Sequence, residues 1–230
     1  MKNITVLAGM SGGVDSTIAA LLLKDRGFHV IGVTMKIWGG EKGFSSKKKG
    51  CYGPGEEEDI EAAREACSRL GIDHHTIDLV HEYEDEVLTY FRDEYIHGRT
   101  PNPCVVCNQR MKFGALLKSI LERGIGFDYF ATGHYARIAR DPSGDRVLLR
   151  TGRDRRKDQS YFLSRLTQEQ LKKSLFPLGD LLKSEVKRLA TDRGLLPFAA
   201  KPESQDFIEA ESYAVLFGKE ACRPGEIVGR

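Results

Sequence analysis

A glycine-rich segment near the N-terminus contains the first residues whose types and spacing could bind a ligand. Between a short apolar run and an expected helix, the chain runs Gly9-Met10-Ser11-Gly12-Gly13-Val14-Asp15-Ser16. Backbone N–H groups at the start of a helix, together with the helix dipole, form a site that suits a phosphate. Because the Gly-Lys-Ser/Thr ending of a Walker A sequence is missing, this segment predicts a phosphate-binding loop of a different type.

Asp15 gives this loop a carboxylate where a lysine would otherwise neutralise the phosphates. A carboxylate and a phosphate repel each other, so we expect a Mg²⁺ ion between them, held by the phosphates and by Asp15 together. The alternative is an ordinary turn from strand to helix, in which the serine and aspartate side chains only cap the helix.

Two cysteines form the second candidate group. Cys104 and Cys107 follow a segment with two prolines, 98–103, and stand at the expected start of a helix. The positive end of a helix dipole lowers the pKa of a thiol, and thiolates are both nucleophiles and metal ligands. A structural zinc site would need two more ligands at a similar spacing, and the sequence offers no second Cys-x-x-Cys or His pair for it.

The elements that must position these groups alternate between short β-type runs and amphipathic helices. This order predicts an α/β fold with a parallel sheet and helices on both faces. We expect strands at 4–8, 29–38, 75–79 and 127–132, and helices from 16 onward and at 60–70, 83–96, 113–121, 168–175 and 183–193. The runs 136–139 and 146–150 flank a turn sequence and predict a hairpin. Residues 39–55 are rich in glycine and predict a mobile loop.

The composition indicates a folded, globular protein. Hydrophobic residues make up 40% of the 230 residues and charged residues 30%, which excludes a disordered chain. The formal net charge is only +2, so any polyanion must bind to a local basic patch. The N-terminal apolar run is too short for a membrane span and lacks the pattern of a signal peptide, so we expect a cytoplasmic protein with no membrane partner. The cytoplasm is a reducing compartment, and the number of cysteines, five, is odd. Both facts argue against a disulfide framework.

Further motifs follow the glycine-rich loop in a fixed order. They are GMSGGVDS at 9–16, MKIW at 35–38, GRTPNPxxxCN at 98–108, ATGHYARI at 131–138, KDQSYFL at 157–163, FPLG at 176–179 and PGEIV at 224–228. In these motifs the chain resembles the tRNA-specific 2-thiouridylases (the MnmA family), which belong to the PP-loop ATP pyrophosphatases. The resemblance implies a PP-loop sheet domain of the adenine nucleotide alpha hydrolase-like kind. It also implies an enzyme that uses ATP to adenylate the oxygen on carbon 2 of wobble uridine and replaces it with sulfur, releasing AMP and pyrophosphate.

The resemblance assigns roles to single residues. It implies that ATP is bound by Gly9, Met10, Ser11, Gly12, Gly13, Val14, Asp15, Ser16, Met35 and Gly133. It implies that tRNA is contacted by Asn102, Pro103, Cys104, Lys157, Asp158 and Gln159, of which the first three meet the target base. Cys107 takes the position of the nucleophile, with Cys104 and Asp15 as further catalytic residues. The implied partners are a tRNA and a sulfur donor, either a persulfide carrier protein or sulfide.

Two positions depart from the family pattern. The family has an aspartate where this chain has Cys104, and a second catalytic cysteine where this chain has Ile208. Two alternatives for sulfur delivery follow. Cys104 and Cys107 either form an exchange pair or are two ligands of an iron–sulfur cluster, with Cys222 or Cys51 as the third. The fifth cysteine, Cys67, is expected to be buried in a helix.

The segment 150–157 has five basic residues among eight. Alone it would indicate a solvated surface turn, but the KDQSYFL motif overlaps it, so we favour contacts with the phosphates of tRNA. Recognition of a single base also needs an aromatic surface. Tyr135 and Tyr161 are candidates for this surface, with packing in the core as the alternative.

The motifs divide the chain into three parts. We expect an ATP-binding catalytic domain at 1–152, a mostly helical annex that contacts tRNA at 153–223, and the start of a β-rich domain, truncated or absent, at 224–230. The leading hypothesis is an ATP-dependent tRNA sulfurtransferase. The alternatives are a PP-loop enzyme that adenylates another acceptor, and a nucleotide-binding or iron–sulfur module with impaired catalysis.

Overall fold

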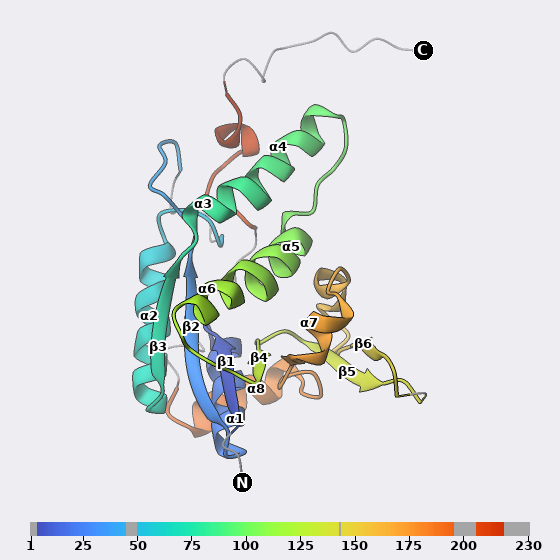
Figure 1. The fold of residues 1–230 in the computed structure, drawn as a ribbon. Coiled ribbons are helices and arrows are strands. Elements are labelled where there is room, and N and C mark those ends of the chain that lie inside the picture. Colours follow the sequence, from blue (N-terminus) through green and yellow to red (C-terminus); the bar gives the residue numbers. More distant parts are fainter. Residues whose placement is uncertain (1–3, 45–49, 143, 196–205, 219–230) are drawn as a thin grey trace.

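One parallel sheet forms the centre of the molecule (Figure 1). The computed structural model describes residues 4–44, 50–142, 144–195 and 206–218. In the order β3-β2-β1-β4-β7, every neighbouring pair of strands is parallel. The strands are β1 (Thr5–Gly9), β2 (His29–Lys36), β3 (Asp73–Asp78), β4 (Tyr129–Ala131) and β7 (Ser174–Leu175). The predicted α/β fold is thereby confirmed.

Helices cover both faces of this sheet, because the central strands are apolar on both sides. Successive side chains of a strand point to opposite faces, and strands that are buried on both faces form continuous apolar runs. Val6 and Ala8 of β1 belong to a core with the helices α1, α2 and α8, whereas Leu7 belongs to the core on the other face, with α6. These helices are α1 (Val14–Asp25), α2 (Glu56–Leu70), α6 (Leu116–Glu122) and α8 (Lys183–Asp192).

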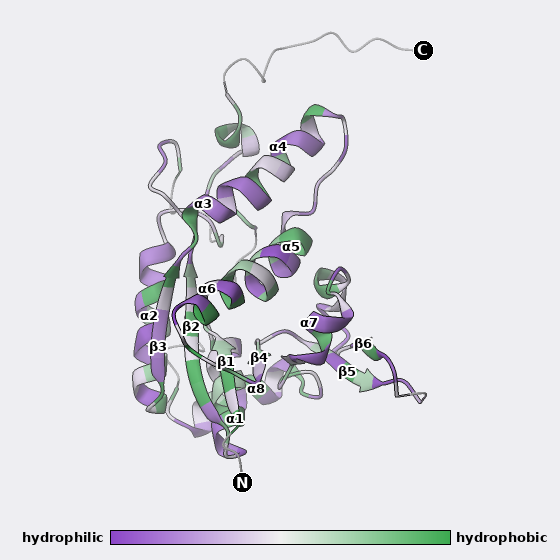
Figure 2. Ribbon diagram, in the orientation of Figure 1, coloured by the Kyte–Doolittle hydropathy of each residue, from purple (hydrophilic) through white to green (hydrophobic). Residues whose placement is uncertain are grey.

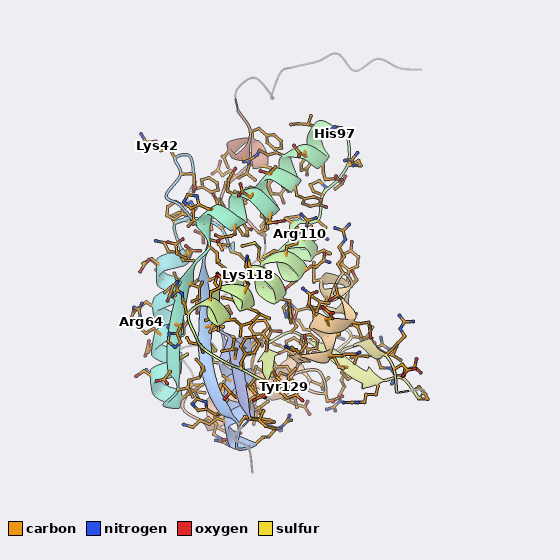
Figure 3. The ribbon with its side chains drawn as sticks, viewed as in Figure 1. Lys42, Arg64, His97, Arg110, Lys118 and Tyr129 are labelled. Carbon is orange, nitrogen blue, oxygen red and sulfur yellow. The ribbon has the colours of Figure 1, made fainter. Side chains whose placement is uncertain are left out.

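The outer surface of the helices is polar. Figure 2 shows β1 and β2 as largely hydrophobic and α2 as largely hydrophilic. Charged side chains such as Arg64 of α2 and Lys118 of α6 lie on the outside of the molecule (Figure 3), with side chains 53% and 78% exposed. In the part of the chain that the structure describes, no helix is both long enough and apolar enough to cross a lipid bilayer.

The Cys-x-x-Cys pair lies in the first turns of a long helix. α5 (Pro103–Val106), a π-helical stretch at Cys107–Ala115 and α6 follow one another without a break. This helix therefore begins earlier than the predicted start at 113. The Asn102 side chain accepts a hydrogen bond from the Val105 N–H at 3.2 Å, and a proline suits the first helical position. A second long helix, predicted at 83–96, runs through α3 (Val80–Tyr83), a π-helical turn at Glu84–Leu88 and α4 (Thr89–Ile96).

The hairpin is confirmed as β5 (Ala136–Arg140) and β6 (Val147–Thr151), which pair in antiparallel register. The Gln168 side chain of α7 (Gln168–Lys172) donates to the Val147 carbonyl and accepts from its N–H, each at 2.9 Å. Figure 1 shows α7 beside this hairpin. The helix predicted at 168–175 is wrong in its last residues. Ser174–Leu175 form the edge strand β7, because the Lys173 and Leu175 carbonyls accept hydrogen bonds from β4 and the residue after it.

The loop predicted at 39–55 is not mobile at its C-terminal end. The Tyr52 N–H donates to the Phe207 carbonyl, and the Glu209 N–H donates to the Tyr52 carbonyl, both at 2.9 Å. Tyr52 is 2% exposed, and its ring stacks on Tyr83 with centroids 5.3 Å apart. The Gly55 N–H also donates to the Glu209 carboxylate at 2.6 Å. Aromatic burial and these hydrogen bonds fix residues 50–55 against 207–209.

Candidate active site

A cavity of about 390 Å³ lies at the carboxyl ends of β1, β2 and β4. In open parallel sheets this edge is where ligands bind. The cavity is lined by the following residues of the predicted ATP site: Gly9, Met10, Ser11, Gly13, Val14, Asp15, Ser16, Met35 and Gly133. The structure thus brings together residues that lie up to 124 positions apart, and the candidate nucleotide site is this cavity.

Gly12 is the one predicted ATP-site residue that is absent from the described lining. Its φ of +69° favours glycine, and a Cβ at this position would approach the Asp59 carbonyl oxygen to 2.4 Å. Gly12 therefore lets the loop pass close to α2. Gly133 has a similar role at the other side of the loop, where a Cβ would lie 2.8 Å from the Ser16 nitrogen.

The loop holds the start of α1 without capping it by a side chain. Gly13 is the N-cap residue, and no described side chain accepts a hydrogen bond at this cap. The Ser16 hydroxyl instead donates to the Gly13 carbonyl at 3.0 Å, and the Thr17 hydroxyl does the same at 2.9 Å. The alternative in which serine and aspartate only cap the helix is therefore not supported, and the helix start keeps the features of an anion site.

The Asp15 carboxylate is paired with two protein groups. The Lys183 Nζ lies 2.6 Å from Asp15 Oδ2, and the Tyr135 hydroxyl donates to Asp15 Oδ1 at 2.8 Å. Lys183 begins α8, and only 10% of its side chain is exposed. Lys183 thus places a positive charge beside Asp15. Among the described residues, no group of three His, Cys, Asp or Glu side chains could hold a metal ion.

Lys183 is the residue of the candidate site that sequence reasoning missed. It lies 168 positions from Asp15, and the only local signal is the FPLG motif that precedes it. Tyr135, a candidate stacking platform, is instead 2% exposed and belongs to the core. Gln159, which was expected to contact tRNA, lines the cavity and accepts the Tyr135 N–H at 3.0 Å. Asp158 accepts the Gly152 N–H at 2.8 Å and so braces the turn after the hairpin.

The wall of the cavity next to α2 carries a carboxyl group with a shifted pKa. Glu56 accepts hydrogen bonds from the backbone N–H groups of Ile37 at 2.7 Å and Trp38 at 3.1 Å. Burial raises the pKa of Glu56 to about 7, because desolvation outweighs these hydrogen bonds. On the opposite wall, burial lowers the pKa of His134 to about 3, and its Nδ1 lies 2.7 Å from the Thr132 hydroxyl. His134 is therefore neutral at physiological pH.

The expectation of low thiol pKa values at the Cys-x-x-Cys pair is wrong. Burial raises the pKa of Cys107 to about 12 and also raises that of Cys104. The charge of Lys112 lowers both values, but desolvation is the larger effect. Neither cysteine is among the described residues of the cavity wall, whereas the exposed Cys51 is.

The other two cysteines differ in what can be said of them. Cys67 is fully buried in α2, as predicted, and burial raises its pKa to about 12. Cys222, an expected third ligand of the cluster, lies outside the described residues.

The basic segment lies on the surface. Arg150, Arg155 and Arg156 are exposed, while Lys157 is half-buried. Arg153 pairs with Glu185 at 3.2 Å. Tyr161, the remaining candidate for stacking, is 63% exposed. These positions are compatible with a contact surface for a polyanion.

A larger cavity, of about 570 Å³, lies between the end of α1 and the hairpin. Arg26, Arg137 and Arg150 are among its lining residues, and Arg137 pairs with Asp180 at 3.3 Å. Its described lining includes none of the predicted ATP-site residues. The smaller cavity is therefore the candidate nucleotide site.

Comparisons with known proteins identify the family of this chain. The family model for the tRNA methyl transferase HUP domain matches residues 4–209. The chain is 47% identical to the tRNA-specific 2-thiouridylase MnmA 2 of Thermoanaerobacter sp. (strain X514), over 97% of this chain and 62% of that protein. It is 43% identical to the tRNA-specific 2-thiouridylase MnmA of Staphylococcus aureus (strain JH9), over 99% of this chain and 59% of that protein. The chain thus spans about three fifths of the length of these relatives.

Among solved structures, a 4-thiouridine synthetase in complex with RNA and bound ATP is similar in fold. The TM-score is 0.52 at 19% sequence identity, over 90% of this chain and 44% of that chain. The match confirms the fold class, and the sequence matches confirm the resemblance to the MnmA family. With the family model covering nearly all of its residues, the chain belongs to the tRNA methyl transferase HUP domain family.

Proposed function

We propose that this chain is the catalytic part of an ATP-dependent tRNA sulfurtransferase. It adenylates the oxygen on carbon 2 of wobble uridine, releasing pyrophosphate, and sulfur then replaces this oxygen as AMP leaves. The observation that carries the proposal is the cavity in which the GMSGGVDS loop, the start of α1 and Lys183 meet. The names of the relatives, tRNA-specific 2-thiouridylases, support the same substrate.

The ATP phosphates would bind at the start of α1. Backbone N–H groups there favour an anion, and Lys183 can turn from Asp15 to a phosphate oxygen within the same cavity. Charge that develops on the leaving pyrophosphate would be stabilised by these fixed donors. Met35 and Gly133 line the part of the cavity proposed for adenine and ribose.

We keep Mg²⁺ in the proposal only as the ion that accompanies the ATP phosphates, where it would neutralise charge. Asp15 accepts one hydrogen bond at each carboxylate oxygen, which leaves lone pairs for this ion, and Oδ2 becomes more accessible when Lys183 turns to the phosphate.

The tRNA would reach this cavity across the surface formed by the hairpin and the segment after it. The exposed arginines of 150–157 suit phosphate contacts, and Tyr161 offers an exposed ring to a splayed base. Asn102, Pro103 and Cys104 are proposed to meet the target base at the start of α5. The division into 1–152 and 153–223 remains part of this proposal, although β7 pairs with β4 and α8 contacts α1.

Adenylation makes sulfur transfer possible because a carbonyl oxygen leaves poorly, whereas AMP leaves readily. A thiol-borne sulfur or hydrosulfide would then attack carbon 2. The sulfur donor is proposed to be a persulfide carrier protein or sulfide. Cys104 and Cys107 take part as an exchange pair or as ligands of an iron–sulfur cluster, with Cys222 as the proposed third ligand.

The test is tRNA-dependent release of pyrophosphate from ATP, followed by analysis of the tRNA nucleosides for 2-thiouridine in the presence of sulfide or a persulfide. We expect both products. Pyrophosphate release without 2-thiouridine would favour adenylation of another acceptor, and the absence of pyrophosphate would leave only a nucleotide-binding module.

A further inference from the structure

Residues 50–52 run beside residues 207–209, and this contact fixes the position of Cys51. Tyr52 is bound to Phe207 and Glu209 through its backbone, and its ring is buried. Cys51 directly precedes this anchored tyrosine, and its side chain is exposed. These hydrogen bonds thus set the position of the Cys51 backbone.

Cys51 lines the nucleotide cavity together with Asp15 and Lys183. Among the cysteines that the structure describes, it alone is both exposed and part of this wall. An exposed thiol can be reached by an external sulfur donor, whereas a buried thiol cannot. Cys51 therefore has access to the donor from outside and to the substrate inside the cavity.

The Cys51 thiol also lies near the Cys-x-x-Cys pair. A negative charge on Cys51 raises the pKa of Cys104 and of Cys107. Charges on all three cysteines raise the pKa of the buried Tyr83 hydroxyl. The packing agrees with this: Tyr52, the neighbour of Cys51, stacks on Tyr83 with ring centroids 5.3 Å apart, and Cys104 and Cys107 pack against the same apolar core. The three cysteines therefore lie around Tyr83, with Cys51 on the side of the cavity.

The segment that carries Cys51 runs beside the position from which a family cysteine is missing. Ile208 stands at this position and is fully buried. A Cβ on Gly50 would lie 2.5 Å from the Ile208 carbonyl carbon, so the two backbones are in direct contact. A thiol on the residue after Gly50 can therefore serve the same region of the site.

We propose that Cys51 carries the transferable sulfur as a persulfide and passes it to the substrate, and that Cys104 or Cys107 then cleaves the S–S bond that still joins this sulfur to Cys51. The inference rests on the proposed function and deepens it by naming the sulfur-carrying residue. It assigns the exposed Cys51 thiol to loading and the half-buried thiols of Cys104 and Cys107 to the later step.

Sulfur would pass from the donor to carbon 2 of the uridine in three steps. The Cys51 thiolate attacks the outer sulfur of a persulfide donor, which leaves as a thiol. The outer sulfur of the Cys51 persulfide attacks carbon 2 of the adenylated uridine, and the bond from carbon 2 to oxygen breaks as AMP takes the electron pair. A thiolate of Cys104 or Cys107 then attacks Cys51 Sγ, the S–S bond breaks towards the sulfur on carbon 2, and the thiol proton ends on the ring nitrogen. The two protein thiols are oxidised to a disulfide, which an external dithiol reduces.

The experiment uses the whole chain, loaded with sulfur by a small-molecule persulfide and freed of excess reagent. It is mixed with ATP and tRNA for one turnover without reductant. Pyrophosphate and 2-thiouridine are measured, remaining thiols are alkylated, and disulfides are mapped by mass spectrometry. Cys51→Ser is the test variant and Cys67→Ala, which removes a buried thiol of α2, is the matched control.

We expect the wild type and Cys67→Ala to form 2-thiouridine and to gain a disulfide between Cys51 and Cys104 or Cys107. In Cys51→Ser, 2-thiouridine formation should fall at least about 10-fold. Any of three results would overturn the inference. They are a disulfide between Cys104 and Cys107 that does not include Cys51, undiminished 2-thiouridine formation in Cys51→Ser, and iron bound by the active protein. Because disulfide mapping on the wild type needs no variant, the test does not depend on the folding of Cys51→Ser. Absence of pyrophosphate from the wild-type mixture would instead overturn the proposed function itself.

Discussion

The Lys183 Nζ lies 2.6 Å from Asp15 Oδ2 and joins the first residue of α8 to the first turn of α1. The lysine is buried, and its Nζ also lies 5.8 Å from the centroid of the Tyr135 ring. A buried charge that loses its partner is costly, so this pair holds the helix starts together. When a phosphate enters the cavity, it offers the lysine a second anionic partner.

Replacing Lys183 by methionine should abolish most of the ATP chemistry. We expect tRNA-dependent pyrophosphate release to fall about 100-fold or more, because a fixed donor to the developing charge is lost. Lys187→Met is the matched control, since Lys187 lies exposed on the same helix. An equal loss in both variants, measured as pyrophosphate release at saturating tRNA, would contradict a specific role for Lys183.

Tyr135→Phe should weaken the positioning of Asp15. The variant loses a 2.8 Å hydrogen bond to Asp15, which should lower the free energy of unfolding by about 1 kcal/mol. We also expect the KM for ATP to rise while kcat changes less, because Asp15 and Lys183 stay in place but are less ordered. Tyr129→Phe serves as the control, and a pure stability effect with an unchanged KM would argue against positioning.

The raised pKa of Glu56 predicts a stability that depends on pH. The pKa is about 7 in the folded chain against 4.5 as its ordinary value, so the folded state binds more protons between these values. Stability should therefore be greatest below about pH 4.5, fall as the pH rises towards 7 and level off above it. In Glu56→Gln this slope should disappear, and in Glu57→Gln it should persist. Urea unfolding across this range measures it, and parallel curves for wild type and Glu56→Gln would refute the assignment.

Alkylation should separate the cysteines by exposure. Iodoacetamide is expected to modify Cys51 first, because it is exposed, and Cys107 slowly, because burial raises its pKa to about 12. ATP should protect Cys51, which lines the nucleotide cavity. Peptide mapping by mass spectrometry reads each site separately. Faster labelling of Cys107, or no protection by ATP, would be inconsistent with this arrangement.

Gly12→Ala should lower the free energy of unfolding by more than the strain of a positive φ alone would cause. At φ +69° a side chain is strained, and its Cβ would also meet the Asp59 carbonyl oxygen at 2.4 Å. Gly27→Ala is the control, since Gly27 has φ +83° with nothing within 4 Å of the added Cβ. We expect about 1 kcal/mol for Gly27→Ala and about 3 kcal/mol for Gly12→Ala, measured by thermal unfolding. Equal losses would remove the proposed close approach.

The sequence was sufficient for those parts of the fold that depend on local pattern. β1 and β2 are apolar runs that are buried on both faces, and their order with α1 and α2 determines a parallel sheet. β7 could not be predicted in this way, because it has two residues, one of them the polar Ser174, and exists only through its pairing with β4.

In the candidate site, too, some residues could be predicted from the local sequence and others could not. The loop residues lie together in the sequence and line the cavity, with Gly12 facing α2 instead. Lys183 comes from a helix whose own pattern gives no sign of Asp15. The predicted lowering of the thiol pKa values was wrong. Burial decides the direction of these shifts, and the burial of Cys107 depends on how distant segments pack around it.

The pairing of Asp15 with Lys183 has a consequence for biosynthesis. The ribosome releases the glycine-rich loop long before it releases α8, so a nascent chain carries the loop without the lysine. The emerging protein would therefore be unable to commit ATP to catalysis until α8 had been translated.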